Sequence, residues 1–108
     1  MTSDVTMYKV IVAPTANDRM VEHFEFLAKV SENAANKLLD GLVKDIESLQ
    51  RMPFRNPVYD RPYVSPLKYR YMFSNKRYRV VYQIVGDTVF VDDIQDCRQS
   101  DDKDLLNQ

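Results

Sequence analysis

The sequence predicts an α+β fold in which an N-terminal helical hairpin packs on one face of a small antiparallel β-sheet. The first half of the chain repeats apolar residues at helical spacing, and the second half holds three stretches rich in β-branched and aromatic residues. A β-branched stretch precedes the helices, so the expected order is β-α-α-β-β-β. We expect residues 1–108 to form a single domain with its core at about 7–98, between a polar N-terminal lead and a short C-terminal tail.

The first strand is expected at residues 7–13, which are rich in β-branched side chains and end at Pro14. Asn17 or Asp18 can then cap a helix. We expect this helix at about residues 18–30 because four apolar residues recur there at helical spacing, namely Met20, Phe24, Leu27 and Ala28.

A second helix is expected to begin after Ser31, which can cap it, and to end near Met52. Pro53 sets this end because proline disfavours helical geometry in the residue before it. One apolar stripe runs along the segment, formed by Ala34, Ala35, Leu38, Leu39, Leu42, Ile46 and Leu49. Gly41 lies inside the helix and lowers its intrinsic helix propensity.

Residues 53–66 contain four prolines and are expected to form a loop, and loops of this length are often functional. Three strands are expected after it, at residues 67–74, 77–85 and 88–95. Gly86-Asp87 suits a two-residue hairpin turn between the last two strands. Asn75-Lys76 suggests a similar tight turn between the first two.

Side chains alternate between the two faces of a strand, so the turn lengths decide which residues share a face. If both turns have two residues, Tyr71 opposes Val80 and Tyr69 opposes Tyr82 on an apolar face that the helices cover. The opposite face then collects Lys68, Arg70, Met72, Arg77, Arg79, Val81, Gln83, Phe90, Asp92, Ile94 and Asp96. This face is either a phosphate-binding surface or a cross-strand lattice of arginines and aspartates, and the spacing alone does not separate the two.

The formal net charge of −1 conceals an uneven distribution along the chain. Residues 51–79 hold eight cationic side chains and one carboxylate, a net charge of +7, whereas the segments before and after carry −3 and −5. Five tyrosines lie in the same basic segment, and this interleaving favours RNA or single strands as a partner. A solvated, self-neutralising surface is the alternative.

Several classes of protein are not supported. Cys97 is the single cysteine, which cannot form an internal disulfide or a multi-thiolate metal site. No apolar run approaches the roughly 20 residues that cross a bilayer, and there is no signal-peptide hydrophobic region, so we expect a cytoplasmic protein without a membrane partner. No glycine-rich phosphate loop, metal-ligand cluster or Ser–His–Asp set is present, so no metal or cofactor is expected. We expect His23 to be either a surface residue or a residue that packs its helix, because it has no sequence partner for metal or nucleophile chemistry.

The chain resembles the RelE/ParE superfamily of bacterial toxins from type II toxin–antitoxin modules, over about residues 8–105. The resemblance rests on Tyr8-Lys9-Val10-Ile11-Val12, Leu49-Gln50-Arg51-Met52-Pro53, Tyr69-Arg70, Tyr78-Arg79-Val80-Val81-Tyr82-Gln83-Ile84 and Asp96-Cys97-Arg98-Gln99. The Tyr-Arg-Val-Val-Tyr run is the most specific of these. The family fold agrees with the elements expected above, and the implied activity is growth inhibition, as in plasmid stabilization modules.

One branch of the superfamily implies a ribosome-dependent, metal-free mRNA endonuclease, in which a 2′-hydroxyl attacks the adjacent phosphate. The resemblance then makes Arg70, Arg79 and Arg98 the catalytic residues that grip the scissile phosphate. The cations expected to steer RNA toward it are Lys68, Lys76 and Arg77, and the candidates for proton transfer are Asp92 and Asp96 or the loop tyrosines Tyr59 and Tyr63.

Four positions depart from the nuclease pattern. Met72 and Gln99 replace expected basic residues, Asp96 replaces a frequent histidine, and Leu105 stands where nucleases carry a tyrosine. The sequence pI of about 5.8 is also low for a protein that targets ribosomes.

Two alternatives are therefore open beside the nuclease. One is a ParE-like inhibitor of DNA gyrase without nuclease activity, and the other is an inactive or repurposed member that only binds an antitoxin. Each version implies a cognate antitoxin whose helix and extended segment wrap the sheet and helices and place acidic residues near Arg70 and Arg79. We expect the free toxin to be a monomer or a weak dimer.

Overall fold

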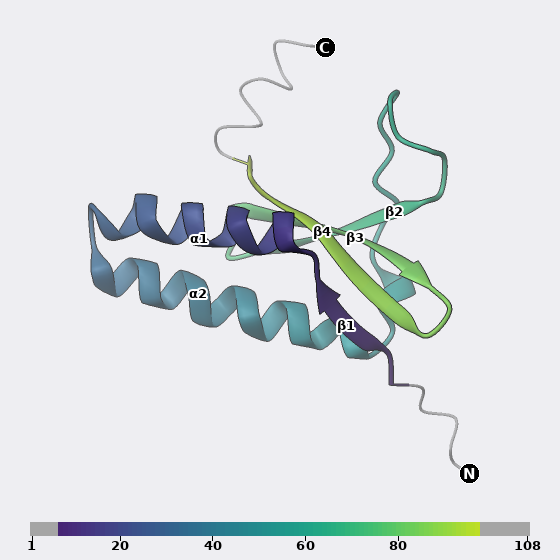
Figure 1. Cartoon of the computed structure of the whole chain (residues 1–108), viewed down its shortest axis with the longest axis horizontal. Helices are drawn as coiled ribbons and strands as arrows, with labels where there is room; N and C mark the ends of the chain where they lie inside the picture. The colour runs from purple at the N-terminus through teal and green to yellow at the C-terminus, as the bar shows by residue number, and fades with distance from the viewer. Residues whose placement is uncertain (1–6, 98–108) are drawn as a thin grey trace.

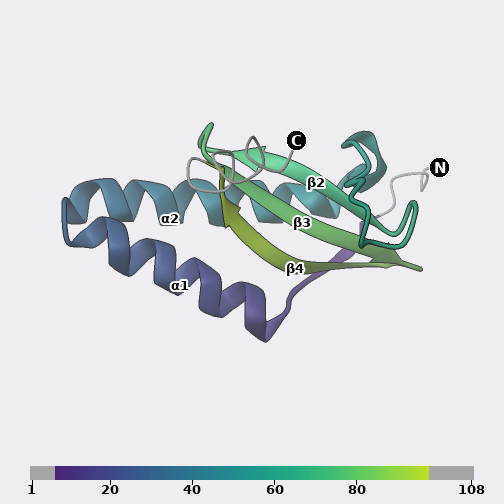
Figure 2. The same ribbon diagram turned by 90° about the horizontal axis from the view of Figure 1, so that it is seen from above.

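The computed structural model describes residues 7–97, which form two helices and a four-stranded sheet. The elements in chain order are β1 (Lys9–Val12), α1 (Pro14–Ala28), α2 (Glu32–Glu47), the 3₁₀ turns η1 (Ser48–Gln50) and η2 (Pro53–Arg55), β2 (Tyr69–Ser74), β3 (Tyr78–Val85) and β4 (Thr88–Asp96). Figures 1 and 2 show both helices on one side of the sheet. The predicted α+β class and element order are therefore confirmed.

The sheet is mixed, with the strand order β1-β4-β3-β2. The pairs β2–β3 and β3–β4 are antiparallel, as expected, but β1 pairs with β4 in parallel. The expectation of a purely antiparallel sheet is therefore wrong for the first strand. The physical reason is that the helical hairpin is a long crossover, which allows β1 to run in the same direction as β2 and β4.

Helix α1 begins at Pro14, four residues before the predicted start at Asp18. Proline suits the first turn of a helix because its fixed φ is already helical and its missing N–H has no partner to lose. Ala13 precedes it with extended geometry and makes no side-chain cap, so the predicted cap at Asn17 or Asp18 is wrong. The predicted cap of the second helix is confirmed, because Ser31 Oγ accepts a hydrogen bond from the Ala34 N–H at 3.1 Å.

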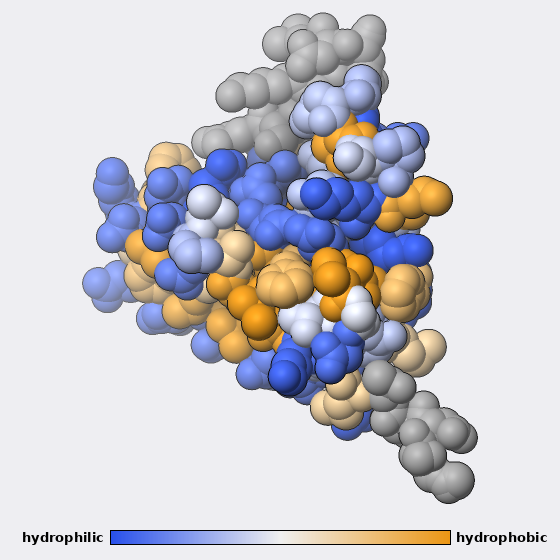
Figure 3. All heavy atoms as spheres, turned by 45° about the vertical axis from the view of Figure 1, so that its right-hand side comes forward, coloured by the Kyte–Doolittle hydropathy of each residue, from blue (hydrophilic) through white to orange (hydrophobic). Residues whose placement is uncertain are grey.

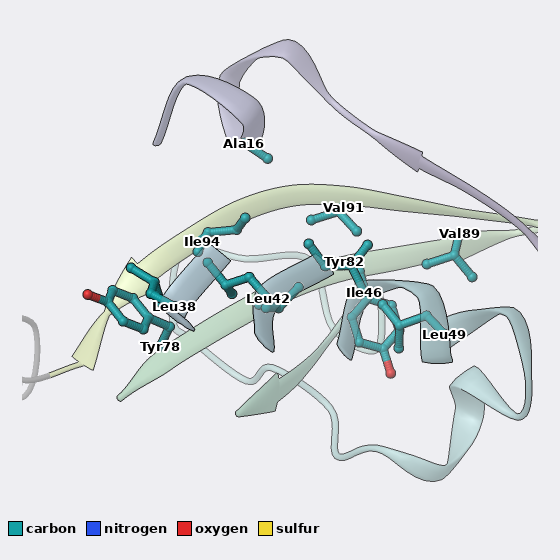
Figure 4. Packing of buried hydrophobic residues seen from close by; sticks show 11 residues of the cluster. Ala16, Leu38, Leu42, Ile46, Leu49, Tyr78, Tyr82, Val89, Val91 and Ile94 are labelled. Atoms are coloured by element: carbon teal, nitrogen blue, oxygen red, sulfur yellow. The ribbon is translucent and has the colours of Figure 1, made fainter. Parts of the chain in front are cut away.

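The core lies between α2 and the inner face of the sheet (Figure 4). Its fully buried members come from the helix side (Ala16, Leu38, Leu42, Ile46 and Leu49) and from the sheet side (Tyr78, Val80, Tyr82, Val89, Val91 and Ile94). The apolar stripe predicted for the second helix therefore supplies most of the helical half of the core. Full burial of each such aliphatic side chain contributes about 1.5–3 kcal/mol.

The turn between β2 and β3 is longer than predicted, and this changes the faces of β2. Ser74 pairs with Tyr78, so residues 75–77 lie outside the ladder. Asn75 and Lys76 both have left-handed backbone geometry, at φ 57° and 59°. A shift of one residue moves every side chain of a strand to the other face. Tyr69, Tyr71 and Phe73 consequently share the outer face with Arg79, and the predicted pairing of this strand is wrong.

The predicted turn at Gly86-Asp87 is confirmed, since Val85 pairs with Thr88 across it. Farther along β4, however, Tyr82 pairs with Val91 and Val81 pairs with Asp93, so Asp92 is the extra residue of a β-bulge. The bulge reverses the faces beyond it. Ile94 and Asp96 lie on the inner face rather than on the predicted outer face, and Gln95 is the residue that opposes Arg79.

Candidate functional site

Arg79 lies at the centre of the outer sheet face and is almost entirely buried, with 7% of its surface exposed. Its Nε donates a hydrogen bond to Gln95 Oε1 at 2.9 Å. Its guanidinium carbon also lies 5.4 Å from the ring centroid of Tyr59 and 5.9 Å from that of Tyr71. Both distances are typical of cation–π contacts. The bulge at Asp92 places Gln95 opposite Arg79, and the loop and β2 add the two aromatic rings beside it.

The proline-rich loop covers Arg79 because part of it pairs with the free edge of β2. The Tyr59 N–H donates to Tyr69 O at 2.7 Å, and the Tyr71 N–H donates to Pro57 O at 3.0 Å. This short bridge places the Tyr59 ring on the outer face, where 6% of the residue is exposed. Arg61 stacks on the same ring at 4.7 Å, and the Tyr59 hydroxyl lies 3.3 Å from Gln95 Nε2, which donates to it.

Arg70 lies on the other face and holds the start of the same loop. Its Nη1 donates to Asn56 O at 2.6 Å and to Phe54 O at 3.1 Å, and its guanidinium carbon lies 5.3 Å from the Phe54 ring centroid. The predicted placement of Arg70 and Arg79 on one face is therefore wrong, because the three-residue turn inverts β2. Arg70 is bound to the backbone carbonyl of Phe54 in η2 and to that of Asn56, which follows η2.

Tyr82 holds the same turn from within the core. Its hydroxyl donates to Pro53 O at 2.6 Å and accepts from Asn56 Nδ2 at 3.0 Å. Burial raises the pKa of Tyr82 above its ordinary value, and the hydrogen bond from Asn56 opposes that rise. The sequence placed Tyr82 in the core but did not reveal this hydroxyl contact, because the partner carbonyl lies 29 residues away along the chain.

Arg77 and Asp96 form a two-pronged ion pair at the opposite end of β3. Arg77 Nε and Nη2 donate to Asp96 Oδ1 and Oδ2 at 3.2 and 3.0 Å. The hydrogen bond to Asp96 is the main cause that raises the pKa of Arg77 above its ordinary value. The side chain of Asp96 is 5% exposed. The carboxylate that was predicted to transfer protons is therefore buried in an ion pair with the Arg77 guanidinium.

A shallow pocket of about 350 Å³ opens on the outer face beside the loop. It is lined by Tyr59, Tyr63, Val64, Tyr69, Val81, Asp92, Asp93 and Gln95. Asp92 Oδ2 accepts from Gln83 Nε2 at 2.7 Å. Three predicted site residues, Asp92 and the two loop tyrosines, therefore meet here. No group of three or more potential metal ligands was found among residues 7–97.

Hydrophobic side chains also gather in a patch on the surface of the molecule. Figure 3 shows them in the centre of the face it draws, between hydrophilic side chains above and below. Ile11 pairs with Phe90 on the outer face of β1 and β4, and Ile11 is 47% exposed. The outer face therefore carries the apolar pair Ile11 and Phe90 at β1 and β4, and three aromatic side chains beside Arg79 at β2 and β3.

A family model described as the ParE toxin of the type II toxin–antitoxin system parDE matches residues 10–100. The chain belongs to the ParE toxin family. This membership confirms the predicted RelE/ParE superfamily and implies an antitoxin as a partner of the toxin.

A solved structure described as the chromosomal ParDE TA system from P. aeruginosa is similar to the toxin in fold. It superposes with a TM-score of 0.68 and 14% sequence identity, over 84% of this chain and 97% of that chain. No curated protein sequence matches the toxin. Neither helix within residues 7–97 has the length and apolar character needed to span a bilayer.

The toxin does not bring Arg70 and Arg79 together. Arg70 and Arg79 are on opposite faces of the sheet, and Arg98 lies outside the described residues. Lys68 and Lys76 are exposed, and the Lys68 ammonium lies 5.3 Å from the ring centroid of Tyr69. His23 packs as expected, with Nε2 2.7 Å from Ile94 O and its ring 5.1 Å from that of Tyr78. Cys97 is buried.

Proposed function

We propose that the toxin acts by binding and inhibiting DNA gyrase, the activity that the resemblance to ParE implies, rather than by cutting mRNA. The observation that carries this proposal is the separation of Arg70 and Arg79 by the sheet. Cleavage through a 2′-hydroxyl needs cations that converge on one phosphate together with a group that transfers a proton. Membership in the ParE family supports the same choice.

The surroundings of each arginine support the proposal further. Arg70 donates to two backbone carbonyls, and Arg79 lies under the Tyr59 ring with 7% of its surface exposed. A phosphate approaching Arg79 would have to displace the loop. The carboxylates are also separated, since Asp96 is bound to Arg77 on the inner face and Asp92 lies at the outer pocket.

The test compares two activities of the same purified toxin. We expect it to inhibit supercoiling by purified gyrase in a concentration-dependent manner, and we expect its induction in cells to trigger DNA damage signalling while mRNA stays intact. Mapped cuts in the ribosomal A site, with gyrase activity unaffected, would replace the proposal with the nuclease alternative. Absence of growth arrest in a host without the antitoxin would favour the inactive, antitoxin-binding alternative.

A further inference from the structure

Strand β1 forms one edge of the sheet, and no strand within residues 7–97 lies beyond it (Figure 1). Its odd-numbered residues bond toward β4, since the Lys9 N–H donates to Asp87 O at 2.9 Å, one residue before that strand begins. The N–H and C=O groups of Val10 and Val12 therefore point away from β4, toward the open side of the sheet. Such an edge is a template for pairing with another chain.

The two ends of β1 limit the register that an added strand can take. Before Val10, the Tyr8 N–H is already bonded to a carbonyl of η1 at 2.9 Å. After Val12, Pro14 has no N–H to donate. Val10 and Val12 are therefore the two residues of this edge that can exchange both backbone bonds with a neighbour, and they lie one residue to either side of Ile11.

This edge is complementary to itself. When two copies of β1 run antiparallel with Ile11 at the centre, Val10 of each copy opposes Val12 of the other, and each of these pairs exchanges two N–H···O=C bonds. The two copies are then related by a two-fold axis, which is the commonest symmetry of protein dimers. The pairing joins two four-stranded sheets into one continuous sheet.

The side chains of β1 suit the same pairing. On the outer face, Ile11 is 47% exposed and would lie directly against Ile11 of the second copy, with Cα atoms about 4.5 Å apart. On the inner face, Val10 and Val12 border an apolar pocket of about 310 Å³ beside α1 and α2, and the valines of the second copy would extend this apolar surface. The pairing therefore removes apolar surface from water on both faces.

The charge of β1 favours a second copy in the antiparallel direction. Lys9 is the one charged residue in the strand Lys9–Val12. With Ile11 at the centre, Lys9 opposes Ala13 of the second copy, and the two lysines lie about 14 Å apart along the strands. This separation exceeds the Debye length of about 10 Å at 0.1 M salt. A parallel pairing would place the two lysines side by side, and like charges in that position destabilise a sheet.

We propose that the toxin without its antitoxin forms a weak homodimer by antiparallel pairing of the two β1 edges, centred on Ile11. The contact is short because β1 has four residues, so the interface is smaller than that of a permanent dimer and association depends on protein concentration. This assigns a surface to the weak dimer that was one expectation from the sequence. The inference goes beyond the gyrase proposal and does not depend on it.

Sedimentation equilibrium of the purified toxin measures the association. We expect the mass to rise from 12.7 kDa toward twice that value as the protein concentration increases. Ile11→Lys and Ile11→Glu should each weaken self-association about 10- to 100-fold, because like charges would meet at the centre of the pairing and the apolar contact would be lost. An equimolar mixture of the two variants should associate again, because opposite charges then meet there.

Val21→Lys is the matched control, because Val21 is 45% exposed but lies on α1, and this variant should associate as the wild type does. A wild-type mass that stays at the monomer value would overturn the inference, and loss of antitoxin binding by Ile11→Lys in that case would assign the edge to the antitoxin instead. Unchanged association of Ile11→Lys, or failure of the mixture to associate, would also overturn it. Each of these outcomes leaves the gyrase proposal in place.

Discussion

Gly41 occupies the middle of α2, where glycine ordinarily weakens a helix, and the β2–β3 turn packs directly against it. A Cβ added at this position would lie 2.5 Å from Asn75 Oδ1 and 2.8 Å from Asn75 Nδ2. Asn75 Nδ2 in turn donates to Ser74 Oγ at 3.1 Å. The glycine therefore provides the space in which the turn meets the helix.

Gly41→Ala should lower the free energy of unfolding by about 1 kcal/mol, because the displaced Asn75 side chain costs more than the helix gains from alanine. Urea unfolding followed by circular dichroism measures this. The matched variant adds Asn75→Gly, which suits φ 57° and removes the obstacle. The double variant should recover wild-type stability or exceed it. A single variant as stable as the wild type would show that the turn does not need the space.

The buried hydroxyl of Tyr82 makes the free energy of unfolding decrease at alkaline pH. Burial raises its pKa above the ordinary value of 10.0, so the unfolded chain loses this proton at a lower pH than the folded toxin. The contribution is fully present below about pH 10 and is lost as pH rises toward the folded pKa. We expect the free energy of unfolding to decline above about pH 10 for this reason.

Tyr82→Phe should remove that part of the decline. It should also cost about 1–2 kcal/mol near neutral pH, since Pro53 O and Asn56 Nδ2 lose their hydroxyl partner. Urea titrations from about pH 8 to 11 measure both effects. The same alkaline slope in the variant and the wild type would assign the decline to other groups.

Among the elements, the turn η2 depends on a residue of β2. Arg70→Ala removes the hydrogen bonds to Phe54 O and Asn56 O, and we expect it to lower the free energy of unfolding by about 1–2 kcal/mol. Residues 53–66 should become more susceptible to limited proteolysis, because this loop loses two of the hydrogen bonds that hold it to β2. Lys68→Ala is the control, since its ring contact is exposed and should be worth less than about 0.5 kcal/mol. Unchanged proteolysis in Arg70→Ala would argue that Tyr82 alone holds the turn.

The ends of the strands were predicted from the sequence more accurately than the sheet face on which each side chain lies. The strands β2, β3 and β4 begin and end within two residues of the predicted ranges. The faces of β2 and of the end of β4 are nevertheless inverted, because one turn has an extra residue and one strand has a bulge at Asp92. The alternation of apolar and polar side chains within a strand does not reveal an extra residue in a turn or in a β-bulge.

For the whole molecule, the antitoxin implied by family membership should bind the folded toxin and not the unfolded chain. At a free antitoxin concentration of 100 times Kd, this binding stabilises the toxin by about 2.7 kcal/mol. For a chain of this size we expect Tm to rise by on the order of 10 °C. Differential scanning calorimetry with the product of the neighbouring gene measures the shift, and an unrelated antitoxin is the control. Equal Tm values with and without the neighbouring product would contradict a functioning two-gene module.

The sequence by itself determined the α+β class, the order of the elements, the Ser31 cap, the apolar stripe of α2 and the superfamily. Each of these follows from local spacing or from a continuous motif, which folding does not rearrange. Only the tertiary structure decided the surroundings of Arg70 and Arg79. The extra turn residue in the pairing of β2 with β3 separates the two cations, which a two-residue turn would place on one face. The bulge in the pairing of β3 with β4 decides that Gln95 lies opposite Arg79.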